Sequence, residues 1–259
     1  MGAFVRIVVD DGVAVVRLDR PPANAIDLQV GLELGEAFRD ASQRDDVGAV
    51  VVWGGEKLFA AGADIKAMAE LGPREIHPIA TALGDALDVL ETMPKISIAA
   101  VNGPALGGGF ELAMAADLRY LAADGSVGQP EIRLGVIPGA GGTQRLTHLV
   151  GPGRAHELVY TGRRVESDEA LRLGLVERVL PPGDVLERAI EDARGFAHGP
   201  RDALAAAKAA IRAAVLLPGP EGLAREGELF RTLFGTIDQR EGMQAFLEKR
   251  DPRFGDRGA

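Results

Sequence analysis

The pattern of apolar and polar residues at the start of the chain predicts a β-hairpin followed by a helix. Residues 4–9 and 13–18 are rich in β-branched side chains and flank Asp10-Asp11-Gly12, where Asp-Gly supplies the turn conformation of a tight hairpin. Asp27 then stands where a helix N-cap is expected, and the helix should reach about residue 41. The spacing of its apolar residues predicts one buried face, formed by Leu28, Leu32, Leu34 and Phe38.

Buried strands alternate with helices in the part of the chain that follows. Consecutive valines at 50–52 predict a buried strand, and Pro73 opens a long amphipathic helix that reaches about Glu91. Residues 96–101 and 118–122 predict two more strands. Strands that alternate with helices indicate parallel crossovers, so we expect an α/β fold.

The second half of the chain is predicted to be mostly helical. Helical periodicity dominates from Gly139 onward, and little strand signal remains after Pro200. A length of 259 residues argues for one large domain or for a domain with an appendage. We therefore expect a core of residues 1–199 and a helical region of residues 200–259.

The segment from Asn102 to Asp117 predicts a strand, a tight glycine turn and a helix. Its run Gly107-Gly108-Gly109 is not a dinucleotide fingerprint, because Leu112 stands where the third glycine is required. The chain also lacks a Gly-Lys-Ser/Thr phosphate loop, and Asp124 replaces the first glycine of a nucleophile elbow. No nucleotide or nucleophile motif explains the glycine run.

Two loops of small residues suit the binding of an anion by the backbone. One loop is residues 59–65 and the other is residues 107–109, and a predicted helix follows each. The unpaired N–H groups at a helix start, together with the positive end of its dipole, stabilise negative charge. If both loops face one pocket, they form an oxyanion hole with two donors. The alternative is that each glycine cluster is only a turn.

Glu111 and Glu131 are candidate acid–base groups. Glu111 lies in the first turn of an apolar helix, and Glu131 follows Gln129-Pro130 in a similar setting. A first-turn glutamate also complements the helix dipole, and a glutamate after proline is often solvated, so each has a purely structural interpretation. Two carboxyl groups in apolar surroundings instead acquire raised and separated pKa values, which acid–base catalysis requires.

Composition and charge exclude several classes of protein. The chain has no cysteine, and His77, His148, His156 and His198 include no His-x-x-x-His pair, so we expect no disulfide, no thiol nucleophile and no metal site. A net charge of −9 opposes nucleic-acid binding. No signal peptide and no membrane-length apolar run is present, which favours a cytoplasmic protein that does not enter membranes.

These features together resemble the crotonase family, the enoyl-CoA hydratase/isomerase superfamily. The matching segments are Leu18-Asp19-Arg20-Pro21, Asn24-Ala25, residues 60–65, 95–117, 129–146, 161–162, 170–176 and 241–254. The likeness covers nearly the whole chain and is greatest to the short-chain enoyl-CoA hydratases, because both glutamates are present. The resemblance implies a spiral of ββα repeats with a C-terminal helical region for trimerisation.

The resemblance also implies a role for each candidate residue. The N–H groups of Ala63 and Gly108 would bind the thioester oxygen, and Glu111 and Glu131 would flank the double bond. Coenzyme A would be part of the substrate, with no separate cofactor. Its implied contacts along one segment are Ala61, Ala63, Asp64, Ile65 and Lys66, and the backbone of Gly139 would approach the acyl chain. Arg20 and Lys249 would bind the phosphates. The alternative for each of these two residues is a solvated surface charge.

The implied activity is reversible hydration of a 2-trans-enoyl-CoA, of the fatty acid β-oxidation type. A Δ3,Δ2-enoyl-CoA isomerase is the nearest alternative, and dehalogenase, decarboxylase and thioester hydrolase relatives stay open, because one fold supports several reactions. An isomerase needs one base, so the presence of Glu111 favours the hydratase. The non-enzyme alternatives are an RNA-binding relative and an acyl-CoA-binding scaffold without catalysis.

Large apolar side chains in the last part of the chain bear on assembly. They lie among charged residues in a short helical stretch, at Phe230, Leu233, Phe234, Phe246 and Leu247. The resemblance implies that such helices build a homotrimer, that two trimers pair into a hexamer, and that Phe246 and Lys249 reach a neighbouring subunit's pocket. The alternative is that these side chains fold back on their own domain.

Overall fold

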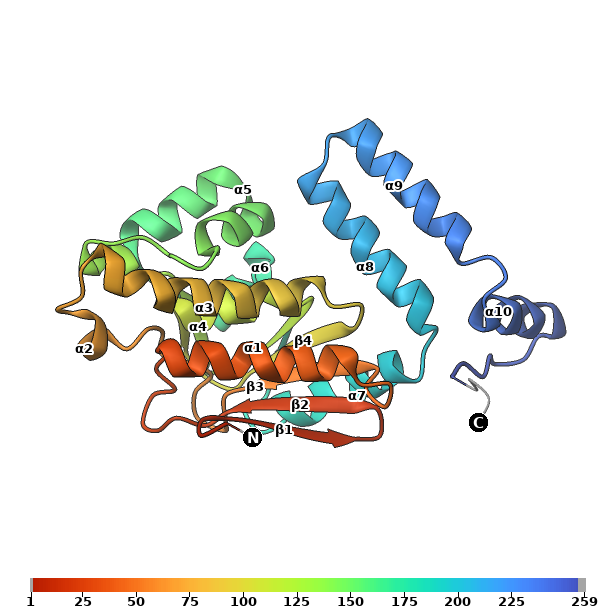
Figure 1. Ribbon diagram of the computed structural model, residues 1–259, viewed down its shortest axis with the longest axis horizontal. Coiled ribbons are helices and arrows are strands. Elements are labelled where there is room, and N and C mark those ends of the chain that lie inside the picture. Colours follow the sequence, from red (N-terminus) through yellow and green to blue (C-terminus); the bar gives the residue numbers. More distant parts are fainter. Residues whose placement is uncertain (1, 256–259) are drawn as a thin grey trace.

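The computed structural model describes residues 2–255, and a six-stranded sheet in the order β1-β2-β3-β4-β6-β9 organises its larger part (Figure 1). β1 and β2 form the predicted hairpin, with Asp10 opposite Val13, and all later pairings in this sheet are parallel. The strands are β1 Val5–Asp10, β2 Val13–Leu18, β3 Ala49–Trp53, β4 Ile96–Val101, β6 Leu118–Ala122 and β9 Arg178–Leu180. The predicted α/β class is confirmed.

A second, smaller sheet carries the glycine turn. Its order is β5-β7-β8, with β5 Ala105–Leu106 parallel to β7 Ser126–Gly128, and β7 antiparallel to β8 Arg164–Glu166. A bridge between Ala60 and Ala105 joins this sheet to the loop before α2. The two small-residue loops are therefore tied together through backbone pairing.

Helices cover both faces of the large sheet. The helices are α1 Leu28–Gln43, α2 Ile65–Met68, α3 Pro73–Thr92, α4 Gly108–Ala115, α5 Gly142–Thr161, α6 Ser167–Leu173, α7 Val185–Ala197, α8 Arg201–Leu216, α9 Gly219–Thr232 and α10 Ile237–Glu248, with the 3₁₀ turn η1 at Glu131–Leu134. Val50 and Val52 face the core under α1 and α3, whereas Ala49 and Val51 face α7. A strand buried on both faces reads as a continuous apolar run, as the valine run does.

The predicted apolar face of α1 was partly wrong. Leu34 and Phe38 are fully buried, but Leu28 is 39% exposed and Leu32 51% exposed. The buried face instead begins at Val30 and includes Glu33, which faces the N-terminal strand. Its carboxylate accepts hydrogen bonds from the backbone N–H groups of Ala3, Phe4 and Val5 at 2.8 to 2.9 Å. Periodicity alone does not anticipate a buried carboxylate that pairs with backbone donors.

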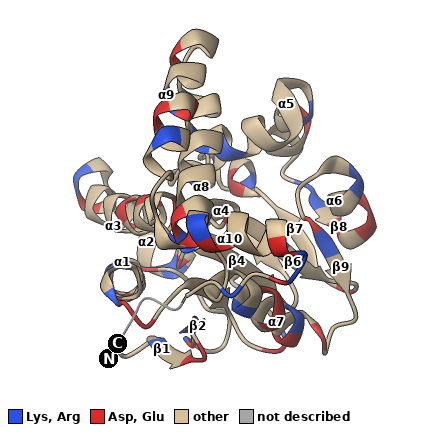
Figure 2. Cartoon of the chain, turned by 90° about the vertical axis from the view of Figure 1, so that its right-hand side faces the viewer, with Lys and Arg blue, Asp and Glu red and all other residues tan. Residues whose placement is uncertain are grey.

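The region after Pro200 is helical, as predicted, and α9 and α10 stand away from the large sheet (Figure 1). α8 is attached to the core by Lys208, whose Nζ donates to Leu90 O at 3.2 Å, Lys95 O at 2.9 Å and Asp117 Oδ2 at 2.8 Å. Both basic and acidic residues lie along α7, α9 and α10 (Figure 2). Among residues 2–255, no helix is long and apolar enough to cross a membrane.

Candidate active site

The turn at Gly107 brings three parts of the chain together. Gly107 has φ +52°, a left-handed conformation, and a Cβ added there would lie 2.9 Å from Glu131 Oε1 and 3.8 Å from Gly62 Cα. Its N–H donates to Gly128 O at 2.9 Å, and its carbonyl accepts from Glu111 N at 2.9 Å. Only glycine meets both the conformation and the space, so this residue allows the two loops and Glu131 to meet.

The other small-residue loop lies directly against this turn. Ile26 N donates to Gly62 O at 2.8 Å, and Asp64 N donates to Ile26 O at 3.0 Å, which leaves the intervening Ala63 N–H outside the pairing. Within residues 2–255, neither the Ala63 N–H nor the Gly108 N–H donates a hydrogen bond to the protein. The two loops therefore lie side by side, and both candidate donors are unbonded.

Glu111 is held by backbone donors from the start of α5. The residue is only 3% exposed, and its Oε1 accepts from the N–H groups of Ala140 and Gly142, each at 2.8 Å. Burial raises the pKa of Glu111, and these two N–H groups act in the opposite direction. A Cβ at Gly142 would lie 2.9 Å from Glu111 Oε1, so the close approach of this backbone depends on glycine.

Glu131 opens the 3₁₀ turn on the other side of Gly107. Burial, together with the negative charge of Glu111, raises the pKa of Glu131 to about 7. Gln129 is 1% exposed and faces this carboxyl group. With its nitrogen toward Glu131, the Gln129 amide donates to both carboxylate oxygens, at 2.8 and 3.1 Å. The two carboxyl groups thus differ in burial and in hydrogen-bond partners.

Arg20 lies at the rim and joins the loop before α2 to the start of α1. Its Nη2 is 2.9 Å from both Asp27 Oδ2 and Asp64 Oδ2, and its Nη1 donates to Ala25 O at 2.8 Å. The Arg20 hydrogen bond lowers the pKa of Asp64. In this chain, Arg20 therefore positions the segment that carries Ala63. Three of the predicted coenzyme A contacts, Ala61, Ile65 and Lys66, are exposed beside it.

Two further predicted site residues differ in place, because Gly139 borders this site whereas Lys249 lies away from it. Gly139 is exposed next to Ala140, and open space surrounds the position that a Cβ would occupy. Lys249 is an exposed residue that ends α10 with φ +56°, and Figure 1 places α10 at the opposite end of the molecule from α2. Sequence reasoning missed the backbone donors of Ala140 and Gly142, because main-chain groups have no residue signature.

Known proteins resemble this chain over nearly its whole length. The family model for enoyl-CoA hydratase/isomerase matches residues 9–257. A probable enoyl-CoA hydratase, echA8 of Mycobacterium bovis, is 43% identical over 95% of each chain. The mitochondrial enoyl-CoA hydratase of Pongo abelii is 42% identical over 94% of this chain and 84% of its own. A solved enoyl-CoA hydratase structure from Geobacillus kaustophilus superposes with a TM-score of 0.93, at 41% identity over 98% of each chain.

The fold, which solved relatives share over nearly the whole chain, defines an enzyme of the crotonase class. Two carboxyl groups in unlike surroundings, beside unbonded backbone donors, are its candidate acid–base groups. The chain belongs to the enoyl-CoA hydratase/isomerase family.

Proposed function

We propose that the protein is an enoyl-CoA hydratase, a hydro-lyase that reversibly adds water in syn fashion to a 2-trans-enoyl-CoA to give a 3-hydroxyacyl-CoA. The observation that carries the proposal is the arrangement of Glu111 and Glu131 around the Gly107 turn, beside two unbonded N–H groups. The names of the relatives support the same reaction. Coenzyme A belongs to the substrate, and the reaction requires no metal or redox cofactor.

The unbonded N–H groups supply the electrostatic part of the mechanism. Water adds to C3 of the double bond. As it does so, the electrons of the double bond shift and negative charge develops on the thioester oxygen. The N–H groups of Ala63 and Gly108 stabilise this enolate-like oxygen. They are fixed before the reaction begins, and loss of one such donor typically costs about 3–4 kcal/mol in the transition state.

The carboxyl pair supplies the proton transfers. Ionised Glu111 orients the water and accepts its proton, while protonated Glu131 donates a proton to C2. The pKa of Glu131, raised to about 7, suits a group that carries a proton near neutral pH. The groups interact, so the two titration steps belong to the pair rather than to either residue alone. In the reverse direction the two roles exchange, and water is released.

Residues at the rim would hold coenzyme A. The segment from Ala61 to Lys66 continues the first of the two loops, is exposed at Ala61, Ile65 and Lys66, and is a suitable edge for the adenine end. Gly139 offers its backbone to the acyl chain. Arg20 already pairs with two carboxylates, so its contribution to phosphate binding would be smaller than that of Lys66. Lys249 would act at the site of a neighbouring subunit.

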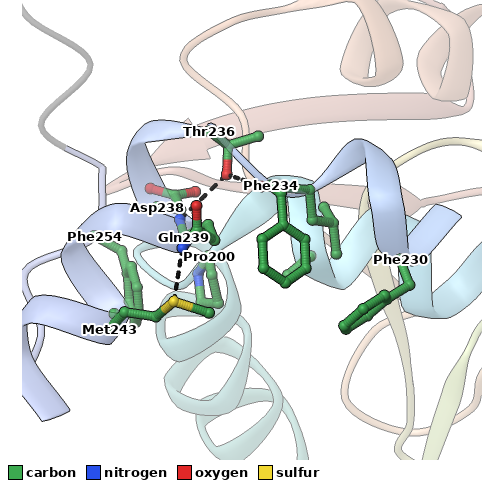
Figure 3. A pocket seen from close by; sticks show the side chains of 11 residues that line it. Pro200, Phe230, Phe234, Thr236, Asp238, Gln239, Met243 and Phe254 are labelled. Carbon is green, nitrogen blue, oxygen red and sulfur yellow. Dashed lines mark hydrogen bonds between the residues drawn. The ribbon is translucent and has the colours of Figure 1, made fainter.

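Assembly into a homotrimer or a homohexamer is part of the proposal, as is a cytoplasmic location. Phe230 and Phe234 pack edge to face yet are 62% and 53% exposed, and they line an apolar cavity of about 270 Å³ (Figure 3). Within residues 2–255, the buried Asp238 Oδ2 in this cavity has no hydrogen-bond partner. An exposed apolar surface with a buried, unsatisfied acceptor is suited to burial against a second copy.

One set of assays tests the activity. The loss of absorbance with C4, C8 and C16 2-enoyl-CoAs measures hydration and its chain-length preference, and the gain of absorbance with a 3-enoyl-CoA measures isomerisation. We expect hydration to be much faster than isomerisation. Faster isomerisation would favour the isomerase, and no hydration combined with a salt-sensitive RNA gel shift would favour a binding protein instead.

A further inference from the structure

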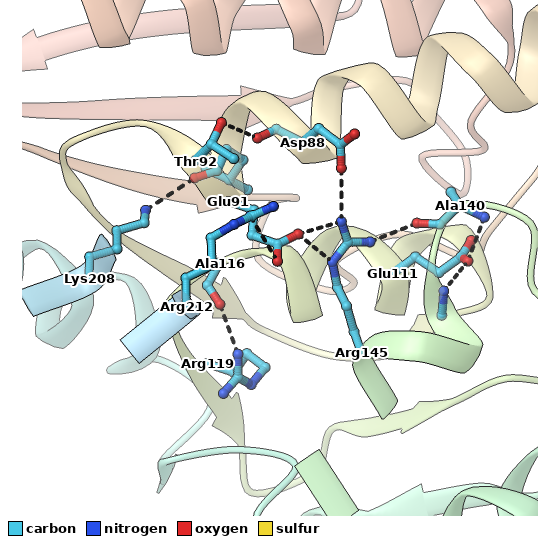
Figure 4. Close-up of polar contacts among 12 residues, drawn as sticks. Asp88, Glu91, Thr92, Glu111, Ala116, Arg119, Ala140, Arg145, Lys208 and Arg212 are labelled. Atoms are coloured by element: carbon cyan, nitrogen blue, oxygen red, sulfur yellow. Dashed lines mark hydrogen bonds and ion pairs between the residues drawn. The ribbon is translucent and has the colours of Figure 1, made fainter. Parts of the chain in front are cut away.

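The backbone that holds Glu111 is itself held by an arginine. Ala140 donates its N–H to Glu111 Oε1 at 2.8 Å, and its carbonyl accepts from Arg145 Nη1 at 2.7 Å (Figure 4). Arg145 lies on α5, one turn after the Gly141-Gly142 start of that helix. A single residue therefore connects the carboxylate to a guanidinium on the far side of the loop.

The guanidinium of Arg145 is fixed from the opposite side by α3. Its Nε and Nη2 donate to Glu91 Oε2 at 3.0 and 2.6 Å, and Asp88 Oδ1 lies 3.5 Å from Nη2. The Arg145 side chain is only 13% exposed. Five donors in a rigid plane allow one arginine to bind a carboxylate on one edge and a carbonyl on the other, which lysine cannot do.

We propose that Arg145 is a positioning residue for the hydration reaction, acting on Glu111 through the Ala140 carbonyl and through its own positive charge. The inference rests on the proposed function. Within residues 2–255, Arg145 is the only side chain that connects the loop of residues 140–142 to α3. Without Arg145 this connection would be lost, and the N–H donors that orient Glu111 would shift. A shift of about 1 Å in a catalytic group costs roughly 100-fold in rate.

The positive charge of Arg145 supports Glu111 in the same way as the hydrogen bond to Ala140 does. The positive charge of Arg145 lowers the pKa of Glu111 and so favours the ionised form that accepts a proton from water. Among the described residues, the other charged or titratable groups around these two are Asp88, Glu91, Asp117, Glu131, His148, Lys208 and Arg212. Arg212 of α8 binds Glu91 Oε1 at 3.1 Å, and within residues 2–255 its side chain forms no hydrogen bond or ion pair with the loop, which makes it the matched control.

Three variants test the proposal by kinetics. Arg145→Met should lower kcat for crotonyl-CoA hydration by about 10- to 100-fold with KM unchanged, and it should move the acid limb of the kcat/KM profile to higher pH. Arg145→Lys, which keeps the charge, should restore the acid limb but only part of kcat. Arg212→Met should keep the kcat and the acid limb of the parent, because the Arg145 contacts with Ala140 and Glu91 remain.

Two outcomes would overturn the proposal. One is a folded Arg145→Met protein with the kcat and acid limb of the parent, and the other is an Arg212→Met protein that loses as much as Arg145→Met. Thermal unfolding and light scattering establish that each variant folds and assembles. If Arg145→Met does not fold, the same comparison is made with Arg145→Lys, whose kcat should lie below that of the parent; an equal kcat would overturn the proposal.

A measurement without substrate separates this proposal from the proposed function. Glutamate labelled with ¹³C at the carboxyl carbon reports the titration of Glu111 by NMR, with Glu111→Gln for assignment. A higher pKa of Glu111 in Arg145→Met than in the parent supports the role of Arg145, and an equal pKa overturns it. A parent protein that hydrates no 2-enoyl-CoA would overturn the proposed function alone.

Discussion

The glycine loops of the active site and the C-terminal helices use small and apolar residues in opposite ways. An added methyl group would lie within 3 Å of Glu131 Oε1 at Gly107 and of Glu111 Oε1 at Gly142, so the backbone and side chains are already in close contact. In α9, no residue is buried. Phe246 of α10 is 83% exposed and Leu247 is 76% exposed. The site is packed within one chain, whereas the helical region has an apolar surface that one chain leaves open.

The difference separates two kinds of dependence on sequence. Around Gly107, the free energy of the arrangement comes from close packing, and one additional carbon atom disturbs it. Around Phe246, the apolar area becomes stabilising only when a partner covers it. A substitution in the first region should therefore act on chemistry, and a substitution in the second should act on assembly.

The largest expected effect is that of Glu131→Gln on catalysis. Removal of the proton donor should lower kcat for crotonyl-CoA hydration by at least about 100-fold, while binding of acyl-CoA persists, because the amide retains the shape of the acid. Steady-state kinetics and calorimetric binding of a saturated acyl-CoA measure the two properties. Exposed Glu56→Gln is the control and should behave as the parent. Near-parental turnover of Glu131→Gln would remove Glu131 from the mechanism.

The next effect concerns the boundary between the two regions. Lys208→Met removes the donor that binds Asp117 and two backbone carbonyls, so we expect a loss of about 2 kcal/mol in the free energy of unfolding. Urea unfolding monitored by circular dichroism measures this loss, with exposed Lys57→Met as the control. An unchanged midpoint for Lys208→Met would mean that the Lys208 hydrogen bonds contribute nothing to stability.

A double substitution in α10 should break assembly without breaking the fold. Phe246→Asp with Leu247→Asp places two charges on the exposed apolar surface, so association should weaken by at least about tenfold while the thermal midpoint of the isolated chain changes little. Light scattering at micromolar concentration should show three or six times 27.2 kDa for the parent and smaller species for the variant. Val8→Asp, a charge at another exposed apolar position, is the control.

The smallest effect is that of pH on the parent protein. Because the pKa of Glu131 is about 7, kcat/KM for hydration should be near half of its maximum at that pH and should fall as Glu131 loses its proton above it. The same pKa also affects stability, because Glu131 holds its proton more tightly in the folded than in the unfolded protein. Its contribution to the free energy of unfolding is therefore complete below the usual glutamate pKa and is lost as pH rises through 7. A flat activity profile between pH 6 and 9 would contradict this assignment.

Much of the fold was predictable because its signals are local. The Asp-Gly hairpin, the valine run of β3 and the proline that opens α3 each appear in the structure where the sequence places them. The short strands β8 and β9, of three residues each, were missed. Three residues carry too little alternation to stand out from a helical pattern, and their pairing with β7 and β6 is decided by distant parts of the chain.

The site was predictable in its acids and loops but not in its supports. Glu111 and Glu131 lie where paired carboxyl groups were expected, and the two loops meet. The hydrogen bonds of Ala140 and the ion pair of Arg145 with Glu91 depend on the packing of α5 against α3, which no motif encodes. Two predictions stay untested by the structure, the role of Lys249 at a site and the division of the chain near Pro200. Residues 1 and 256–259, which belong to the two predicted parts, lie outside the described residues.

The unbonded N–H groups at Ala63 and Gly108 have a consequence for how such a site is mapped by mutagenesis. A main-chain donor survives every substitution except one to proline, the only encoded residue without an N–H. An alanine scan would therefore pass over these positions without removing either donor, even though both contribute to the proposed chemistry. Replacement of one peptide link by an ester, which exchanges the N–H for an oxygen, would delete a single donor and leave the side chains as they are.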